Sequence, residues 1–245
     1  TLDPRAQKAA YDGLAGRTGA VVALDPRTGA ILAMASSPSF DPNTLSSHDP
    51  ASIRKAYDAY TNDPDKPLLN RPLVMALPPG STFKLVTAAA ALESGQYTPS
   101  TVVPGPASLK LPLTDKELRN WSGTACGPGG KTTPTNALAI SCNTAFASIG
   151  MELGDEALRE QAEKFGWGTS FEVPLRAAAS QFPEDPDEPQ TAMSAIGQFD
   201  VTATALQMAM VGAGIGNNGQ VMSPYLVSQV LSPELEVLET AEPVA

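Results

Sequence analysis

The chain has 245 residues, of which 42% are hydrophobic and 17% are charged, and its formal net charge is -10. This size fits one large domain or two small ones with a full apolar core. Such an acidic chain is a poor candidate for binding nucleic acid or an anionic membrane surface. No apolar run approaches the ~20 residues that a membrane span needs. The first residues also lack the pattern of a signal peptide, so we expect either a cytosolic protein or a chain that starts after its targeting segment.

The single histidine, His48, excludes a metal site of the Cys/His type and any catalytic triad that does not use this residue. We expect His48 in a surface loop, and we expect no metal and no cofactor. The two cysteines, Cys126 and Cys142, have two interpretations. They are either buried free thiols or, in a secreted enzyme, one disulfide that closes a short loop.

The start of the chain predicts a helix followed by a β-hairpin. Asp3 and Pro4 are residue types of a helix N-terminus, and the helix is expected to run to about Leu14. Two short apolar runs, residues 19–24 and 30–35, flank a Pro/Gly turn, which is typical of a hairpin. Because both runs are apolar throughout, we expect both faces of the hairpin to be covered.

The segment Leu77-Pro-Pro-Gly-Ser-Thr-Phe-Lys84 is the centre of the sequence. Two prolines and a glycine make a rigid entry, and small apolar residues then continue to Gly95, a plausible helix end. We therefore expect Ser81 in the first turn of a helix that is buried in the core. Lys84 follows three residues later, so the two side chains would share one helix face.

This pair suits covalent catalysis by a serine. A serine hydroxyl is activated when a neighbouring base takes its proton, and a lysine amine can act as that base once burial or a helix N-terminus lowers its pKa. The backbone N–H of Ser81 could also help to hold an oxyanion. The alternative is chance, because Ser52-Ile-Arg-Lys55 has the same spacing within a polar stretch that we interpret as an exposed amphipathic helix.

The rest of the chain alternates between loops and helices. Loops are predicted for the Pro-, Gly- and Asp-rich segments 36–80 (with one short helix at about 51–60), 96–131 and 167–190. Helices are predicted at 135–140, from Ser141 to about Leu153, at 156–165 with Asp155 as cap, and from the cap Thr202 to about Val211. Residues 221–231 are predicted to be extended.

Ser141-Cys142-Asn143 is the only Ser-x-Asn sequence in the chain. It lies where one predicted helix ends and the next begins, a junction that can present a hydroxyl and an amide to a cleft. Serine can relay a proton between a lysine and a leaving group. Asparagine has donors and an acceptor that suit a substrate amide. Taken alone, either residue could instead cap the following helix.

Together, Ser-x-x-Lys on a buried helix and Ser-x-Asn about 60 residues later resemble the motifs of the serine penicillin-recognising enzymes. The segment Arg17–Asn43 is similar to the hairpin that opens the transpeptidase domain of penicillin-binding proteins. Asn70-Arg71 and Ala195-Ile-Gly-Gln198 are similar as well. The resemblance covers most of the chain and is strongest to the class B enzymes of actinobacteria, which Ser-Cys-Asn-Thr-Ala-Phe resembles as well.

The resemblance implies an α+β fold, with an antiparallel sheet flanked by helices and a helical subdomain that carries Ser-x-Asn. Residues 1–245 would belong to one transpeptidase domain. Ser81 would be acylated by the D-Ala-D-Ala end of a peptidoglycan stem peptide, and β-lactams would acylate it and stay. Lys84 would be the general base, and Ser141 would shuttle the proton to the leaving group. Asn143 would hold the substrate amide and help to position Lys84, and the amine of a second stem would then form the cross-link.

The chain departs from the family in lacking its third motif, Lys-Thr-Gly. Lys131-Thr-Thr133 lies upstream of Ser141 and has threonine in place of glycine, so it does not match. In the family the motif and the last strands follow a segment like Pro224-Tyr-Leu-Val227, and we therefore expect the chain to stop ~90 residues short of the domain end. That part would supply the substrate carboxylate site, half of the oxyanion hole and most of the sheet. The chain by itself is accordingly expected to be inactive.

Two related activities and a non-catalytic role are alternatives. A class A β-lactamase needs a Glu-x-x-x-Asn pattern after Asn143, and the class D pattern has valine at that position; neither occurs here. A β-lactam sensor would be acylated once and would neither join nor hydrolyse peptides. A scaffold that only keeps the fold would not react with penicillin.

The resemblance also implies a location and partners. Its substrate lies outside the cytoplasmic membrane, so the full-length protein would be anchored there with this domain outside. Besides stem peptides and β-lactams, a membrane glycosyltransferase of the SEDS type would be a partner, and nucleic acid would not. An extracytoplasmic location favours the Cys126–Cys142 disulfide, which would pin residues 127–130 beside the active site.

Overall fold

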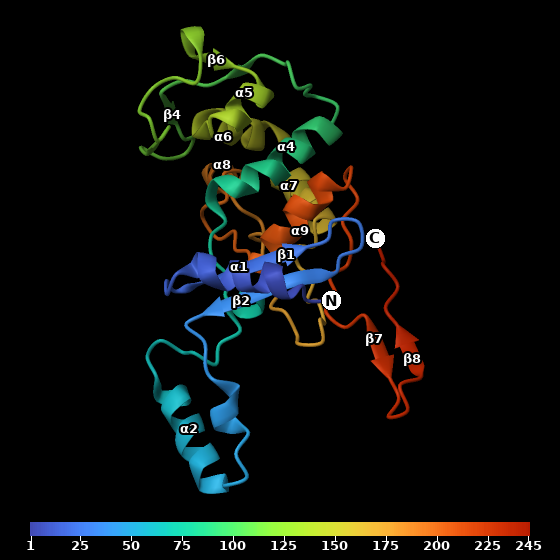
Figure 1. Cartoon of the computed structure of the whole chain (residues 1–245). Helices are drawn as coiled ribbons and strands as arrows, with labels where there is room; N and C mark the ends of the chain where they lie inside the picture. Colours follow the sequence, from blue (N-terminus) through green and yellow to red (C-terminus); the bar gives the residue numbers. More distant parts are fainter. The chain divides into compact units, whose positions relative to one another are not determined.

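The computed structural model describes residues 1–245, which fall into two compact units (Figure 1). Unit 1 contains residues 1–75, 171–178 and 204–245, and unit 2 contains residues 76–170 and 179–203. No helix combines the length and the apolar character that crossing a membrane requires.

Unit 1 is built on the predicted helix and hairpin. Helix α1 (Pro4–Leu14) begins where the Asp3 carboxylate accepts two backbone N–H groups of the first turn. Strands β1 (Gly19–Leu24) and β2 (Ile31–Ser37) pair antiparallel, and α1 lies along them in Figure 1. The hairpin register contains one bulge, next to Leu24, which changes the face to which the following side chains point.

Both faces of the hairpin are covered, and this prediction is confirmed. On one face, Ala10 of α1 packs against Ala33. On the other face, Ile31 is fully buried in a cluster with side chains from α3 (Arg71–Val74) and α9 (Ala205–Gly216). The hairpin is therefore a central layer of unit 1, which explains why neither strand alternates between apolar and polar residues.

Helix α9 starts two residues later than predicted. Thr204, and not Thr202, is its cap, and the Thr204 side chain accepts the N–H of Gln207. Thr202 is unavailable because its backbone N–H and carbonyl group are both bonded to the backbone of Gln181. The helix also continues to Gly216, past the predicted end at about Val211.

An excursion of the chain follows β2 and contains η1 (Pro42–Leu45) and α2 (Pro50–Asn62), the latter drawn in cyan in Figure 1. Helix α2 has no buried residue, as expected of the exposed second Ser-x-x-Lys copy. The rings of Phe40 and Tyr60 meet with 5.7 Å between their centroids, which closes the excursion on itself.

The buried guanidinium of Arg71 binds both ends of this excursion. It donates to the carbonyl oxygen of Pro38 at 3.1 Å and to that of Lys66 at 3.3 Å, and it also donates to the carbonyl oxygen of Asp65. Arg71 is 4% exposed. The chain therefore leaves and rejoins the body of unit 1 at one place.

Unit 2 is mainly helical. Its helices are η2 (Gly80–Phe83), α4 (Lys84–Glu93), η3 (Pro128–Gly130), α5 (Pro134–Ala139), α6 (Asn143–Leu153), α7 (Asp155–Lys164) and α8 (Glu188–Ser194). Helix α4 contacts α5, α6 and α7. Ala91 of α4 and Phe146 of α6 lie in one buried cluster, which makes α4 the central helix of the unit.

The predicted helices of unit 2 are confirmed as α5, α6 and α7, with small shifts at their ends. Asp155 is the first residue of α7 and Gly154 is its cap, which corrects the predicted cap. Helix α8 begins within the segment 167–190, which we expected to be a loop, and continues to Ser194.

Strands also occur where loops were predicted. The segment 96–131 contains most of two short antiparallel pairs, and the end of unit 1 contains a third. These are β3 (Val103–Pro104) with β6 (Lys131–Thr132), β4 (Ser108–Lys110) with β5 (Glu117–Arg119), and β7 (Gln229–Leu231) with β8 (Val237–Thr240). Only the last residues of the predicted extended segment 221–231 form a strand.

Candidate active site

Ser81 lies in the 3-10 helix η2, directly before α4. We predicted that Ser81 starts the α-helix, and this is wrong because α4 begins at Lys84. Gly80 has a φ of +56°, which a right-handed α-helix does not accept, so the α-helical hydrogen bonds start after it. In a 3-10 turn, residues i and i+3 eclipse each other. The shorter turn therefore brings Ser81 and Lys84 into line more directly than an α-helix would.

A close backbone approach supports this turn. The N–H of Gly80 donates to the carbonyl oxygen of Gly197 at 2.9 Å. A Cβ atom on Gly197 would lie 2.2 Å from the Gly80 oxygen, and its φ of +70° also favours glycine. Sequence analysis used Gly197 only as part of a family resemblance and missed this role. Gly197 lies in the turn that follows α8, and because this helix was not predicted, the glycine had no assigned place in the sequence.

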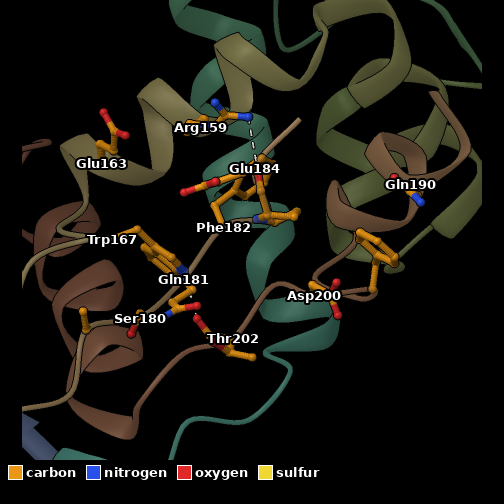
Figure 2. A pocket seen from close by; sticks show the side chains of 14 residues that line it. Arg159, Glu163, Trp167, Ser180, Gln181, Phe182, Glu184, Gln190, Asp200 and Thr202 are labelled. Carbon is orange, nitrogen blue, oxygen red and sulfur yellow. Dashed lines mark hydrogen bonds between the residues drawn. The ribbon is translucent and has the colours of Figure 1, made fainter. Parts of the chain in front are cut away.

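Phe83 fastens the turn to the core of unit 2. Its ring is fully buried, meets Trp167 edge-on with 5.4 Å between the ring centroids, and stacks on Phe182 at 5.9 Å. Trp167 and Phe182 also line a pocket with a volume of about 730 Å³, shown in Figure 2. Because Phe83 is buried while Ser81 is exposed, the turn is anchored and its hydroxyl stays accessible.

Ser141 and Asn143 lie at the junction of α5 and α6, where the sequence predicted a break between helices. Ser141 has a φ of +58°, a left-handed conformation that costs a non-glycine residue ~1 kcal/mol or more. Its carbonyl oxygen lies 2.8 Å and its hydroxyl 3.1 Å from Nζ of Lys84. The unfavourable backbone conformation thus occurs where it brings two oxygens to the lysine.

Lys84 is the residue at which the other three candidate residues meet. Its Nζ lies 3.2 Å from Oγ of Ser81 and 2.7 Å from Oδ1 of Asn143, in addition to the two Ser141 oxygens. The side chain has no solvent exposure and takes part in none of the ion pairs of the structure. Burial therefore lowers the pKa of the Lys84 amine from 10.5 to about 8.

The hydrogen bonds of a neutral Lys84 can be assigned by counting. The amine has two N–H donors and one lone pair. Its two shortest contacts are the carbonyl oxygens of Ser141 and of the Asn143 side chain, which can only accept. Both donors are used there, so the lone pair is left for the hydroxyl proton of Ser81 or Ser141. The arrangement can take a proton from one hydroxyl and return it through the other.

The Asn143 amide is oriented by a second contact. Its Nδ2 donates to the carbonyl oxygen of Arg119 at 3.1 Å, which leaves Oδ1 facing Lys84. An amide nitrogen has two N–H groups. One of them is therefore available to a ligand.

A disulfide joins Cys126 to Cys142, and no free cysteine remains. The residue between Ser141 and Asn143 is thereby attached to the loop that contains η3. Sγ of Cys142 also accepts the backbone N–H of Ala145 in the first turn of α6. The bond thus holds the Ser-x-Asn segment at its middle residue.

Two other sequence candidates have different surroundings. Ser52 lies on α2, where its hydroxyl donates to the Asp49 carboxylate at 2.6 Å as part of the cap of that helix. His48 is exposed between η1 and α2, as predicted. Neither residue lies next to a buried lysine amine, as Ser81 does.

Residues 19–244 match the family model of the penicillin binding protein transpeptidase domain. The chain is 42% identical to the peptidoglycan D,D-transpeptidase PbpA of Mycolicibacterium smegmatis, over 99% of this chain and 50% of that protein. The penicillin G acyl-enzyme complex of penicillin-binding protein A from M. tuberculosis has a TM-score of 0.95 and 39% identity, over 99% of this chain and 57% of that chain. A structure on the coordination of polymerization and crosslinking by a peptidoglycan synthase complex has a TM-score of 0.84 and 31% identity, over 100% of this chain and 45% of that chain.

The chain spans about half the length of the curated relatives it matches. Its α+β architecture is that of the penicillin-binding-protein transpeptidases, which confirms the predicted fold. The family match covers the whole of unit 2, and in unit 1 it leaves out residues 1–18 with helix α1, and Ala245. By sequence and by fold, the chain belongs to the penicillin-binding protein transpeptidase domain family.

Proposed function

We propose that the chain carries the acylation chemistry of a peptidoglycan D,D-transpeptidase. Ser81 is the nucleophile, Lys84 the general base, Ser141 the proton relay and Asn143 the ligand of the substrate amide. The observation that carries the proposal is the buried Lys84 amine, 3.2 Å from the exposed Ser81 hydroxyl and held by the other two residues. An amine with a pKa of about 8 is neutral in a useful fraction of molecules near neutral pH.

In the first step the Lys84 lone pair takes the Ser81 hydroxyl proton while Oγ forms a bond to the carbonyl carbon of the penultimate D-alanine. The backbone N–H of Ser81 offers one donor to the resulting oxyanion. The proton then moves through Ser141 to the leaving nitrogen, the C–N bond breaks, and D-alanine departs. Finally, the amine of a second stem peptide attacks the ester, its proton returns to Ser81, and the cross-link is formed.

The relatives support the choice of substrate and location. Proteins similar to this chain are named peptidoglycan D,D-transpeptidases, and one is seen as a penicillin G acyl-enzyme. We therefore propose stem peptides ending in D-Ala-D-Ala as substrates and β-lactams as inhibitors. The similarity to a peptidoglycan synthase complex supports a membrane glycosyltransferase of the SEDS type as partner. Both imply work outside the cytoplasmic membrane by a membrane-anchored protein.

The test is the intact mass of the protein after incubation with penicillin. Because no Lys-Thr-Gly sequence occurs in the 245 residues, the measurement uses this chain and also the same chain continued through a Lys-Thr-Gly segment. We expect one penicillin adduct on the longer polypeptide and none after Ser81→Ala. Ser52→Ala, in the exposed Ser-x-x-Lys copy, is the matched control and should be acylated like wild type.

The products distinguish the alternatives. A transpeptidase releases D-alanine from a stem peptide and joins the remainder to an added acceptor amine. Release with hydrolysis alone would favour a β-lactamase-like hydrolase, and a penicillin adduct without any peptide product would favour a sensor. An adduct that persists in Ser81→Ala would refute the assignment of the nucleophile.

A further inference from the structure

We infer that Asn120 is a positioning residue of the acylation site, an inference that rests on the function proposed above. Asn120 directly follows β5 and is 5% exposed. Its Oδ1 accepts the backbone N–H of Asn143 at 3.0 Å and that of Thr144 at 3.1 Å. The Thr144 hydroxyl lies 3.3 Å from the same oxygen. None of the sequence motifs includes Asn120.

Asn120 thereby caps helix α6 from outside. The first N–H groups of a helix have no partner within it, and the residue directly before the helix usually supplies one. Here that residue is Cys142, whose sulfur accepts the N–H of Ala145 but neither of the two N–H groups before it. The N–H groups of Asn143 and Thr144 are bound instead by a side chain from a different segment of unit 2. The start of α6 is thus fixed relative to that segment.

The Asn120 amide is itself held on all sides. Its Nδ2 donates to the carbonyl oxygens of Pro106 and Thr124, both at 2.9 Å. The Thr144 hydroxyl also lies 2.8 Å from the Pro106 oxygen. Because both N–H groups and the oxygen are used, the buried amide cannot rotate without losing hydrogen bonds.

Arg119, the residue before Asn120, also binds Asn143. The Arg119 carbonyl oxygen accepts Nδ2 of Asn143, while Asn120 accepts its backbone N–H. Oδ1 of Asn143 is in turn the shortest hydrogen-bond partner of Lys84. A displacement of the Asn143 backbone therefore moves the acceptor that determines where the Lys84 lone pair points. Asn120 acts on Ser81 through Asn143 and Lys84, without touching the reacting atoms.

The test compares Asn120→Ala with Asn120→Asp and with the control Asn136→Ala. Asn136 also lies in unit 2, and its Nδ2 donates to the Cys126 carbonyl oxygen and to the Thr132 hydroxyl, but not to α6. The measurement is the rate of acylation by a fluorescent penicillin, per folded molecule, from about pH 6.5 to about pH 9.5, on the polypeptide that continues through a Lys-Thr-Gly segment. Asn120→Ala should slow acylation roughly 10- to 100-fold, and the control should stay within about twofold.

Asn120→Asp keeps the acceptor for the two N–H groups of α6 but places its second oxygen against the carbonyl oxygens of Pro106 and Thr124, so it should restore only part of the rate. Its added negative charge favours the protonated lysine and should move the midpoint of the pH–rate profile upward. Equal rates for Asn120→Ala and the control, with an unchanged midpoint in Asn120→Asp, would overturn the inference.

A second measurement does not depend on acylation. Hydrogen exchange of the Asn143 and Thr144 amides should accelerate in Asn120→Ala and stay unchanged in Asn136→Ala. Unchanged exchange in both variants would also overturn the inference. If the wild-type polypeptide that includes a Lys-Thr-Gly segment is not acylated at all, the proposed function fails, and the exchange data alone decide whether Asn120 holds the start of α6.

Discussion

Replacing Lys84 with methionine should remove the contribution of this lysine to the pH dependence of the free energy of unfolding. Burial lowers the pKa of Lys84 to about 8 in the folded state, while the unfolded chain has the ordinary value of 10.5. Between these two values the unfolded state binds the additional proton, so the free energy of unfolding of wild type rises with pH. Below both values the amine is protonated in either state, and the folded state bears the full cost of burying the charge.

The magnitude follows from the two pKa values. A difference of one unit corresponds to ~1.4 kcal/mol, so the fall from 10.5 to about 8 amounts to about 3 kcal/mol. Between about pH 7 and about pH 10, some ~2.5 kcal/mol of this should appear, because the unfolded-state amine is still mostly protonated at the upper limit. Methionine has a similar length and no charge, so Lys84→Met should lack this increase, and all other titrating groups cancel in the comparison.

The assay is urea denaturation of wild type and Lys84→Met at both pH values, followed by circular dichroism. The free energy of unfolding of wild type should increase by ~2.5 kcal/mol relative to the variant. Lys55→Met, on the exposed helix α2, is the control and should show no such change. A difference between wild type and Lys84→Met that stays constant within ~0.5 kcal/mol would mean that Lys84 titrates alike in both states. The physical argument for a neutral lysine base would then fail.

Three further predictions concern catalysis and the support of the site. For the polypeptide that includes a Lys-Thr-Gly segment, the rate of acylation by penicillin should rise about fivefold from pH 7 to pH 8 and level off above about pH 9, because Lys84 loses its proton. Stopped-flow fluorescence measures the rate, and a flat profile would contradict the prediction. Gly197→Ala should destabilise the protein by several kcal/mol more than Gly168→Ala, because both glycines have positive φ but only a Cβ on Gly197 meets backbone atoms. Thermal denaturation compares the two variants, and equal losses of stability would show that the clash at Gly197 is relieved. Replacing Cys126 and Cys142 together by serine should lower the free energy of unfolding by about 3 kcal/mol, because the disulfide closes a loop with a sequence separation of 16. A loss below ~1 kcal/mol would show that the loop is ordered without the disulfide.

Local signals made part of the fold predictable. The Asp3 carboxylate accepts backbone N–H groups in the first turn of α1, and Asp3 with the following proline indicated this helix start in the sequence. Helix α8 carried an equally local signal that was overlooked. Asp187 and Gln190 form a capping box, which was interpreted as part of an acidic, proline-rich loop.

Other features depended on contacts between distant residues. The strands β4 and β5 have three residues each, too short for a periodic pattern, and their pairing fixes them. The sequence suggested that Ser81, Lys84, Ser141 and Asn143 belong together only through a family resemblance, because no spacing rule connects two motifs on separate helices. Asn120 had no local signal for its role, since its partners in α6 lie 23 and 24 positions further along the chain.

The hydrogen bonds of Arg71 to both ends of the excursion have a practical consequence. Since the chain departs and returns beside one guanidinium, the length between Pro38 and Asp65 is decoupled from the hairpin beneath it. For a flexible loop, doubling the number of residues costs only ~0.6 kcal/mol of closure entropy. The exposed stretch around His48 is accordingly the place in unit 1 where a peptide tag or a natural insertion can be accommodated while the layers around the hairpin keep their packing.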